Sequence, residues 1–157
     1  MTITLRHWEP ADEPFLWDML YLAIHVPDGH EAPPRSVLEV PSIGHYLVEF
    51  GSRFGDDAVI AWDDDVAVGA AFCRRFDDDY PSYGFVSDDI PEVGMAVLPT
   101  HRGRGIGRTL LTELLDRHPV MSLSVDTDNI RACALYESMG FFVVRSGETS
   151  VTMLRRG

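Results

Sequence analysis

The sequence contains no lysine, so all 13 of its basic residues are arginines. A Walker A loop reaches the terminal phosphates of a nucleotide with a lysine, so that class of site is excluded. Cysteine is also scarce: Cys73 and Cys133 lie in apolar stretches, and no Cys-x-x-Cys spacing links them. This usage indicates neither a disulfide framework nor a zinc site. We therefore expect no metal and a reducing, cytoplasmic setting.

A long hydrophobic run is missing as well. No stretch approaches the roughly 18 apolar residues of a membrane-spanning helix, and the first ten residues carry Arg6 and Glu9 where a signal segment would be apolar. We expect a soluble, unsecreted protein without a membrane partner. The 157 residues, 45% of them hydrophobic, suit one globular domain over residues 1–157 that folds without disulfides.

Positively charged residues are few compared with negatively charged ones. The 25 acidic residues outnumber the 13 basic ones, which gives a formal net charge of −12. A surface of this charge repels nucleic-acid phosphates and anionic lipid, so we expect no nucleic-acid partner. A polyanionic ligand must then be held by a local group of arginines.

The hydrophobic pattern predicts a mixed α/β chain. Strands are expected at residues 3–8, 58–62, 66–75, 92–98, 120–125, 141–145 and 149–154. Helices are expected from Asp12 to Ala23, more weakly at 36–50 with a break near Pro41, from Ile106 to just before Pro119, and at 132–139. Residues 26–34 and 76–91 are expected to be loops. In the strand at 92–98, Gly94 and Ala96 give one face small side chains.

A glycine-rich turn lies between the strand at 92–98 and the helix that follows it. It reads Arg102, Gly103, Arg104, Gly105, Ile106, Gly107 and Arg108. Glycines let the backbone direct several N–H groups to one point, and the N-terminus of the next helix adds partial positive charge. The turn therefore predicts a diphosphate site, although a tight turn with solvated arginines would have the same composition.

The spacing of the glycines bears on which phosphate ligand fits. A dinucleotide fingerprint requires Gly-x-Gly-x-x-Gly, but Arg108 or Leu110 stands at its third position here. Asp126 does lie about 20 residues further on, where that fingerprint places an acid for the ribose. The Rossmann interpretation therefore stays open, although the first half of the chain is typical of hairpins.

Two segments resemble the GNAT superfamily of N-acetyltransferases. The run from Ala96 to Gly107 contains the acyl-CoA pattern Arg/Gln-x-x-Gly-x-Gly/Ala, with Arg102, Gly105 and Gly107 at its fixed positions. The run from Asn129 to Phe141 is similar to the Asn-x-x-Ala-x-x-Leu-Tyr-x-x-x-Gly-Phe signature at every fixed position. The resemblance covers about the last 65 residues in detail and the first half only in its order of elements.

The resemblance implies a GNAT fold: a strongly twisted mixed central sheet, flanked by helices, with splayed parallel strands. The strands at 92–98 and 120–125 would separate to admit the pantetheine arm of acetyl-CoA, and the small face of the first would suit that arm. The backbone at Met95, Ala96 and Val97 would pair with the arm and polarise the thioester carbonyl. The diphosphate-binding residues would be Arg102, Gly103, Arg104, Gly105, Ile106, Gly107 and Arg108.

The resemblance also implies catalytic residues. The hydroxyl of Tyr136 would protonate the departing CoA thiolate, although a core tyrosine would occupy the same position in the helical stripe. Asn129 would contact the pantetheine, or serve only as a helix N-cap. Glu92 is the candidate general base, since some members of the family use a glutamate near this position, directly or through water. Others place an acid in the next strand, where this chain has Ser122 and Ser124. The alternative for Glu92 is an exposed acid at the start of a strand.

The sequence says less about the site of the acetyl acceptor. His25, His30 and Glu31 lie on a loop that could line its site, whereas His101 is expected to be a turn residue. Aspartates cluster at 56–57, 63–65, 77–79 and 88–89, either as solvated turns or as an acidic rim for a cationic acceptor.

The sequence thus predicts an acetyl-CoA-dependent N-acetyltransferase. It would move the acetyl group directly to a primary amine of a small molecule or peptide, without a metal or a covalent enzyme intermediate. The alternative is a non-catalytic acyl-CoA-binding sensor, which would keep the glycine-rich turn and have no use for Tyr136 or Glu92. A homodimer is left open.

Overall fold

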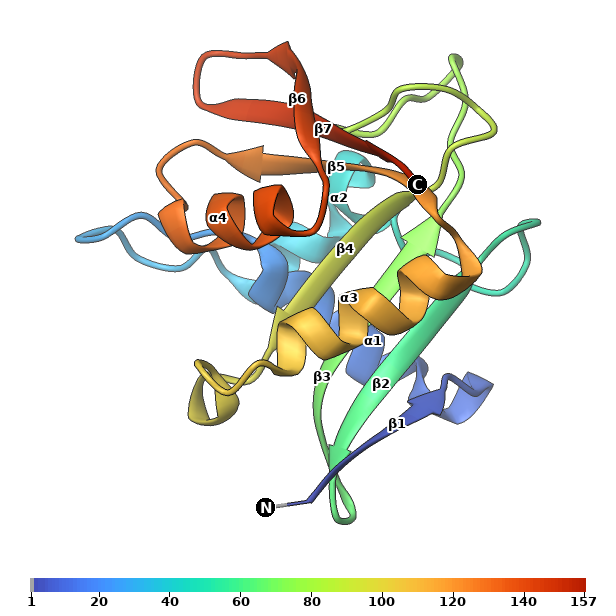
Figure 1. The fold of residues 1–157 in the computed structure, drawn as a ribbon, viewed down its shortest axis with the longest axis vertical. Helices are drawn as coiled ribbons and strands as arrows, with labels where there is room; N and C mark the ends of the chain where they lie inside the picture. The colour runs from blue at the N-terminus through green and yellow to red at the C-terminus, as the bar shows by residue number, and fades with distance from the viewer. Residues whose placement is uncertain (1) are drawn as a thin grey trace.

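A seven-stranded mixed sheet forms the centre of the computed structural model, which describes residues 2–157 (Figure 1). Its order is β1-β2-β3-β4-β5-β7-β6. The strands are β1 (Ile3–His7), β2 (Asp57–Asp63), β3 (Val66–Arg74), β4 (Glu92–Val97), β5 (Val120–Asp126), β6 (Phe142–Ser146) and β7 (Ser150–Arg156). β4 and β5 run parallel, and the other neighbours are antiparallel. All seven predicted strands are confirmed, with small shifts at their ends.

Short helices connect the strands. They are α1 (Glu13–Ala23), α2 (Pro41–Gly44), α3 (Ile106–Arg117) and α4 (Ile130–Ser138), with single 3-10 turns at η1 (Pro10–Asp12), η2 (Arg35–Glu39) and η3 (Pro99–His101). The helix expected at 36–50 is reduced to η2 and α2, because Val40, which precedes a proline, is extended at ψ 124°. Across residues 2–157, no helix is both long enough and apolar enough to cross a membrane.

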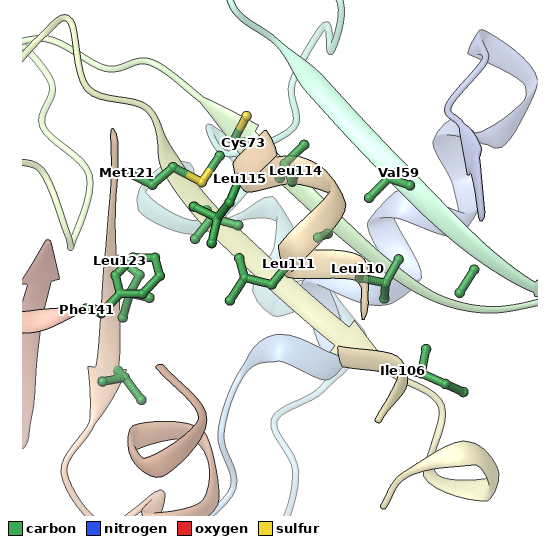
Figure 2. Packing of buried hydrophobic residues seen from close by; sticks show 14 of the residues in the cluster. Val59, Cys73, Ile106, Leu110, Leu111, Leu114, Leu115, Met121, Leu123 and Phe141 are labelled. Carbon is green, nitrogen blue, oxygen red and sulfur yellow. The ribbon is translucent and has the colours of Figure 1, made fainter. Parts of the chain in front are cut away.

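The helices cover both faces of the sheet. α3 crosses one face and α1 the other (Figure 1). The apolar side chains of α3 point onto the sheet and pack against residues such as Val59, Met121 and Leu123 (Figure 2). The buried residues of α3 are Ile106, Leu110, Leu111, Leu114 and Leu115. On the opposite face, Leu16 and Met19 of α1 pack against Ile60 and Phe72. The two cores hold the sheet between them.

The sheet is incomplete between β4 and β5. These strands share one register pair, Glu92 with Ser122, and the Ser122 N–H donates to the Pro91 carbonyl at 3.0 Å. Beyond that point β4 continues beside β3, whereas β5 continues beside β7 (Figure 1). The parallel strands therefore diverge, as the sequence predicted.

The small face of β4 does not open onto this gap. Gly94 lies opposite Phe72 of β3, and a Cβ at Gly94 would come within 2.6 Å of the Phe72 ring. Ala96 belongs to the core beneath α1. The expectation that this face would receive the pantetheine arm is therefore wrong, because a neighbouring aromatic ring already fills it.

A buried arginine holds the chain that leads into β2. Arg74, 1% exposed, donates from Nε and Nη2 to the two carboxylate oxygens of Asp56, each at 2.9 Å. Its Nη1 donates to the carbonyls of His45 and Val48 at 3.0 and 2.7 Å. An unpaired buried guanidinium would be very costly, so this residue fixes the path of the segment from α2 to β2.

Asp57 joins β1, β2 and the end of α3. Its carboxylate accepts from Arg117 Nε at 2.8 Å and from His118 Nε2 at 2.7 Å, and His7 Nε2 lies 3.1 Å away. These hydrogen bonds and charges hold the pKa of Asp57 well below its usual value despite the opposing effect of burial. The carboxylate therefore stabilises the fold in its ionised form.

The stability of the fold should depend on this carboxylate. The contribution of Asp57 is fully present above the unfolded-state pKa, about 3.9, and is lost as the pH falls toward the lower folded-state pKa. We expect Asp57→Asn to reduce the free energy of unfolding at pH 7 by roughly 2–4 kcal/mol and to flatten its dependence below pH 4. Urea denaturation at a series of pH values measures both effects.

Asp65→Asn is the matched control, since this side chain lies in the exposed turn between β2 and β3. It should leave the unfolding midpoint nearly unchanged. An Asp57→Asn protein as stable as the unmodified chain at pH 7 would contradict the role given to Asp57.

Candidate active site

The turn between β4 and α3 forms one end of the site. Gly103 and Gly105 have φ angles of +77° and +79°, which glycine adopts at little cost. Gly105 is the residue before α3, so the free N–H groups of the first helical turn face the space beside it. Arg102 Nε donates to the Val97 carbonyl at 3.0 Å and fixes the turn to β4. An anion such as a diphosphate fits these donors.

Gly107 marks the point where β4, α3 and α4 meet. A Cβ at Gly107 would lie 3.4 Å from Met95 Cε and 3.8 Å from Leu135 Cδ2. These are ordinary contact distances, so a small side chain fits the protein itself. A larger side chain would enter the space between the strand and α4.

The edge of β4 that faces the gap offers unpaired backbone groups. Because the Pro91 carbonyl accepts from Ser122, the odd-numbered residues of β4 direct their N–H and C=O groups toward β5. The Val97 carbonyl is taken by Arg102. Met95 lies between them, beyond the last register pair of β4 and β5. Its backbone can therefore pair with an extended ligand in the gap.

Tyr136 lies on α4, next in sequence to Leu135. Its ring packs edge-on against Phe141 at a centroid distance of 5.8 Å. Burial, with a smaller effect of Cys133, raises the pKa of Tyr136 to about 12. Within the described chain, no hydrogen bond occupies its hydroxyl. The group is therefore protonated at neutral pH and available as a donor.

The ends of α4 are fixed by polar contacts. The Asn129 side-chain oxygen accepts from the Ala132 N–H at 3.4 Å, which confirms the predicted N-cap. Arg108 Nη2 donates to Ser138 Oγ at 2.8 Å and links α3 to α4. A cavity of about 510 Å³ continues from Arg108 along these helices as far as Arg155. It adjoins the glycine-rich turn at Arg108.

Glu92 is buried, 3% exposed, at the point where β4 and β5 meet. Its carboxylate accepts hydrogen bonds from the Tyr46 and Ser82 hydroxyls and, at 2.9 Å, from the Gly84 N–H. Burial raises the pKa of Glu92 despite these donors. The alternative of an exposed strand-start acid is therefore wrong. Sequence patterns gave no signal for Tyr46 or Ser82, because they lie in segments without a regular period.

The remaining histidines have separate positions. His25 Nε2 pairs with Asp128 at 3.0 Å, which brings the loop after α1 to the turn before α4. His30 and Glu31 are exposed on that loop. His101 Nε2 contacts Asp63 at 2.9 Å, as suits a turn residue.

Three potential metal ligands do meet beside α4. The ligand atoms of His25, Asp126 and Asp128 lie within 4.8 Å of one another. The ion pair between His25 and Asp128 accounts for this arrangement, so it does not by itself indicate a metal.

The four aspartate clusters do not form one acidic rim. Asp56 neutralises the buried Arg74, and Asp57 is bound by Arg117 and His118. Asp77 accepts from the N–H groups of its own turn at 3.0 and 3.1 Å. The first cluster is structural because the core contains a guanidinium that requires a counter-charge. Exposed carboxylates remain at Asp64, Asp65, Asp78, Asp79, Asp88 and Asp89.

Curated proteins match a limited part of this chain. The N-alpha-acetyltransferase RimI of Mycobacterium tuberculosis is 57% identical over 49 residues, which is 30% of this chain and 31% of that protein. The uncharacterized protein ML0378 of Mycobacterium leprae is 55% identical over 49 residues, 30% of this chain and 14% of that protein. The matches therefore span less than a third of the length of each relative.

Solved structures match over nearly the whole chain. The PaiA N-acetyltransferase of Thermoplasma acidophilum, in complex with coenzyme A, has a TM-score of 0.71 at 17% identity and covers 100% of both chains. A ribosomal-protein-alanine N-acetyltransferase of Brucella melitensis has a TM-score of 0.68 at 24% identity, covering 97% of this chain and 98% of that one. YncA of Salmonella typhimurium, solved with acetyl-CoA, has a TM-score of 0.65 at 20% identity, covering 99% and 92%. These neighbours share the fold of this chain.

A family model described as the acetyltransferase (GNAT) family matches residues 6–141. That range begins in β1 and ends at Phe141, just before β6, so it includes the diverging strands, the glycine-rich turn and α4. The chain therefore belongs to the GNAT family of acetyltransferases.

Proposed function

We propose that the protein transfers an acetyl group from acetyl-CoA to a primary amine by direct attack within a ternary complex. The observation that carries this proposal is the gap between β4 and β5, where Met95 has its register partner Ala71 in β3 but, within residues 2–157, none in β5. Solved GNAT-fold neighbours contain acetyl-CoA or CoA, which supports acetyl-CoA as the acetyl donor here. Bound acetyl-CoA would supply the activated acetyl group and the thiolate leaving group.

The chain offers binding groups along the length of such a donor. The N–H groups at Gly105 and Gly107, with the partial positive charge of the α3 N-terminus, suit the diphosphate. The remaining residues of the glycine-rich turn contribute beside them, as does Asn129 at the wall of the gap. The backbone at Met95, with Ala96 and Val97 beside it, would orient the pantetheine and polarise the reacting carbonyl.

Tyr136 is the proposed general acid. A hydroxyl with a pKa of about 12 keeps its proton at neutral pH, so it is present as a hydrogen-bond donor when negative charge develops on the departing sulfur. Within residues 2–157 the Tyr136 hydroxyl has no hydrogen-bond partner, so its proton can be donated to a ligand. A sensor that binds acyl-CoA without catalysis would have no use for it.

Glu92 is the proposed general base, acting through a hydroxyl. Three donors surround its carboxylate, so an acceptor amine has no direct approach. The amine proton would pass to the oxygen of Tyr46 or Ser82 as that hydroxyl gives its own proton to Glu92. Burial raises the pKa of Glu92, which favours its taking up a proton.

Direct transfer is also supported by the state of the cysteines. Burial raises the pKa of Cys73 and, to a lesser degree, that of Cys133. Neither thiol is activated toward the thiolate that an acyl-cysteine intermediate requires.

A peptide α-amine is the acceptor we favour. The similarity to RimI, an N-alpha-acetyltransferase, supports it, although small-molecule amines remain the competing class. We expect a short peptide with a free N-terminus to be acetylated with a kcat/KM at least about tenfold above that of the N-terminally blocked peptide or of spermidine. Mass spectrometry of the products identifies the modified nitrogen. Faster acetylation of spermidine would overturn the peptide assignment.

Donor binding can be checked in the same preparation. A valine at Gly107 would enter the space beside Met95 and Leu135, so Gly107→Val should weaken CoA binding at least about tenfold, or 1.4 kcal/mol. Ala134→Val, which adds the same branched side chain to an exposed position of α4, is the control and should bind CoA normally. Equal affinity for the two variants in calorimetry would contradict the proposed binding site.

The role of Tyr136 predicts a specific kinetic pattern. Tyr136→Phe keeps the ring that packs against Phe141 and removes the proton donor. We expect kcat to fall by about 10²-fold or more while the affinity for acetyl-CoA stays nearly constant, since the lost interaction exists only in the transition state. Steady-state rates and CoA titration measure the two quantities. An unchanged kcat would make this tyrosine a packing residue.

The role of Glu92 predicts a dependence on pH. Glu92→Gln retains the shape of the side chain but cannot take up a proton. We expect its kcat/KM to fall most at pH values below the pKa of the acceptor amine, where a base must remove the amine proton. The pH profiles of the variant and of the unmodified protein provide the comparison. An equal loss at every pH would assign Glu92 to positioning alone.

A further inference from the structure

A second cavity lies at the end of β4 remote from the glycine-rich turn. Its volume is about 410 Å³, and its walls come from the segment after α2 and from the loop that follows β3. The residues that define it chemically are His45, Arg53, Arg75, Phe76, Tyr80 and Asp88. None of them belongs to the proposed acetyl-transfer site.

His45, which lines this cavity, carries an unsatisfied polar atom. The residue is 8% exposed, and within residues 2–157 its Nε2 is buried without a hydrogen-bond partner. The ring lies between Tyr80 and Phe76 at centroid distances of 4.5 and 4.9 Å. Burial, together with Arg53 and Arg74, lowers the pKa of His45, so the ring is neutral at pH 7. A neutral imidazole has one ring nitrogen without a proton, which can accept a hydrogen bond from a ligand.

Two guanidinium groups bring positive charge to the same cavity. Arg53 Nη1 donates to the Arg75 carbonyl at 3.5 Å, and Arg75 Nε donates to the Asp88 carbonyl at 2.7 Å. A guanidinium has five N–H groups, so both arginines keep donors for a ligand. The guanidinium carbons of Arg53 and Arg75 lie 5.8 and 5.5 Å from the ring centroids of Phe76 and Phe54. The planar guanidinium of an arginine matches the geometry of a carboxylate, and this cavity is lined by two such groups.

We propose that this cavity binds a small carboxylic acid whose α-carbon carries a hydroxyl or amino group. The carboxylate would accept hydrogen bonds from Arg53 and Arg75, and the α-substituent would donate to Nε2 of His45. An α-amino acid would also place its ammonium near the carboxylates of Asp77 and Asp88, which line the same cavity. An α-hydroxy acid lacks that positive charge. The relative affinities for an α-amino acid and an α-hydroxy acid therefore show which of the two is the ligand.

The cavity is connected to the acetyl-transfer site through Tyr46. This residue follows His45, and its ring meets Phe76 at a centroid distance of 5.1 Å. Its hydroxyl donates to Glu92. A ligand that holds His45 and Phe76 would therefore also restrict Tyr46, and occupancy of the cavity would change the rate of acetyl transfer. This regulatory effect rests on the proposed function, whereas binding of the ligand does not.

Calorimetry without acetyl-CoA tests binding directly. The purified protein is titrated with L-alanine, L-lactate and propionate, which differ only in the α-substituent. We expect binding of alanine or lactate at least about tenfold tighter than binding of propionate. Tighter binding of alanine than of lactate would identify the amino acid as the ligand, and the reverse order the hydroxy acid.

Variants assign the binding to this cavity. Arg53→Gln and Arg75→Gln should each weaken the preferred ligand at least about tenfold, because each removes a charged donor. His45→Phe should remove the preference over propionate. Arg35→Gln, which removes an exposed arginine paired with Asp18, is the control and should leave binding unchanged. Absence of binding by all three compounds at 10 mM, or binding unaffected by both arginine variants, would overturn the proposal.

Regulation requires a separate measurement. Saturating ligand should change the kcat of acetyl transfer at least about twofold in the unmodified protein and have no effect in Arg53→Gln. Loss of acetyl transfer in every assay would refute the proposed function and leave the calorimetric result standing. A normal acetyl transfer rate without ligand binding would refute this inference alone.

Discussion

The divergence of β4 from β5 is the constraint on which the rest of the structure depends. Adjacent strands in a sheet normally satisfy each other's backbone groups, yet here one register pair joins the two strands. The junction is held by Glu92, which draws Tyr46, Ser82 and the Gly84 N–H to the point of separation. At the other end of β4, Arg102 satisfies the carbonyl of Val97. Contacts within the chain therefore define both ends of the gap.

Most of the fold could be predicted from sequence because its elements carry strong local signals. The leucines of α3 recur at helical spacing, the strands alternate, and each GNAT motif is contiguous in sequence. The segment from Ser36 to Phe50 could not be predicted well, since its path is set by carbonyl contacts with the buried Arg74. The role of Asp56 was hidden for the same reason: its partner is 18 residues away in sequence.

The residues of the candidate site also differ in whether contiguous motifs or contacts distant in sequence determine their positions. The positions of the glycine-rich turn, Asn129 and Tyr136 follow from contiguous motifs, so the sequence identifies them. The environment of Glu92 does not, because its three donors come from segments that are 46, 10 and 8 residues away. The fit of Phe72 over Gly94 is a cross-strand contact that depends on register. A single sequence does not specify such a register.

Gly84 bears on how the loop at 76–91 can change in length. A Cβ at this residue would lie 2.5 Å from the Leu123 carbonyl carbon and 2.7 Å from the Ser124 nitrogen, so the loop backbone rests directly on β5. The loop is thus fixed at its centre, whereas its stretch at Asp78 and Asp79 is exposed. Related sequences or designed grafts could lengthen the exposed stretch at Asp78 and Asp79 without disturbing the sheet. An insertion between Ser82 and Gly84 would displace Gly84 from β5. It would also move apart the Ser82 hydroxyl and the Gly84 N–H, which both donate to Glu92.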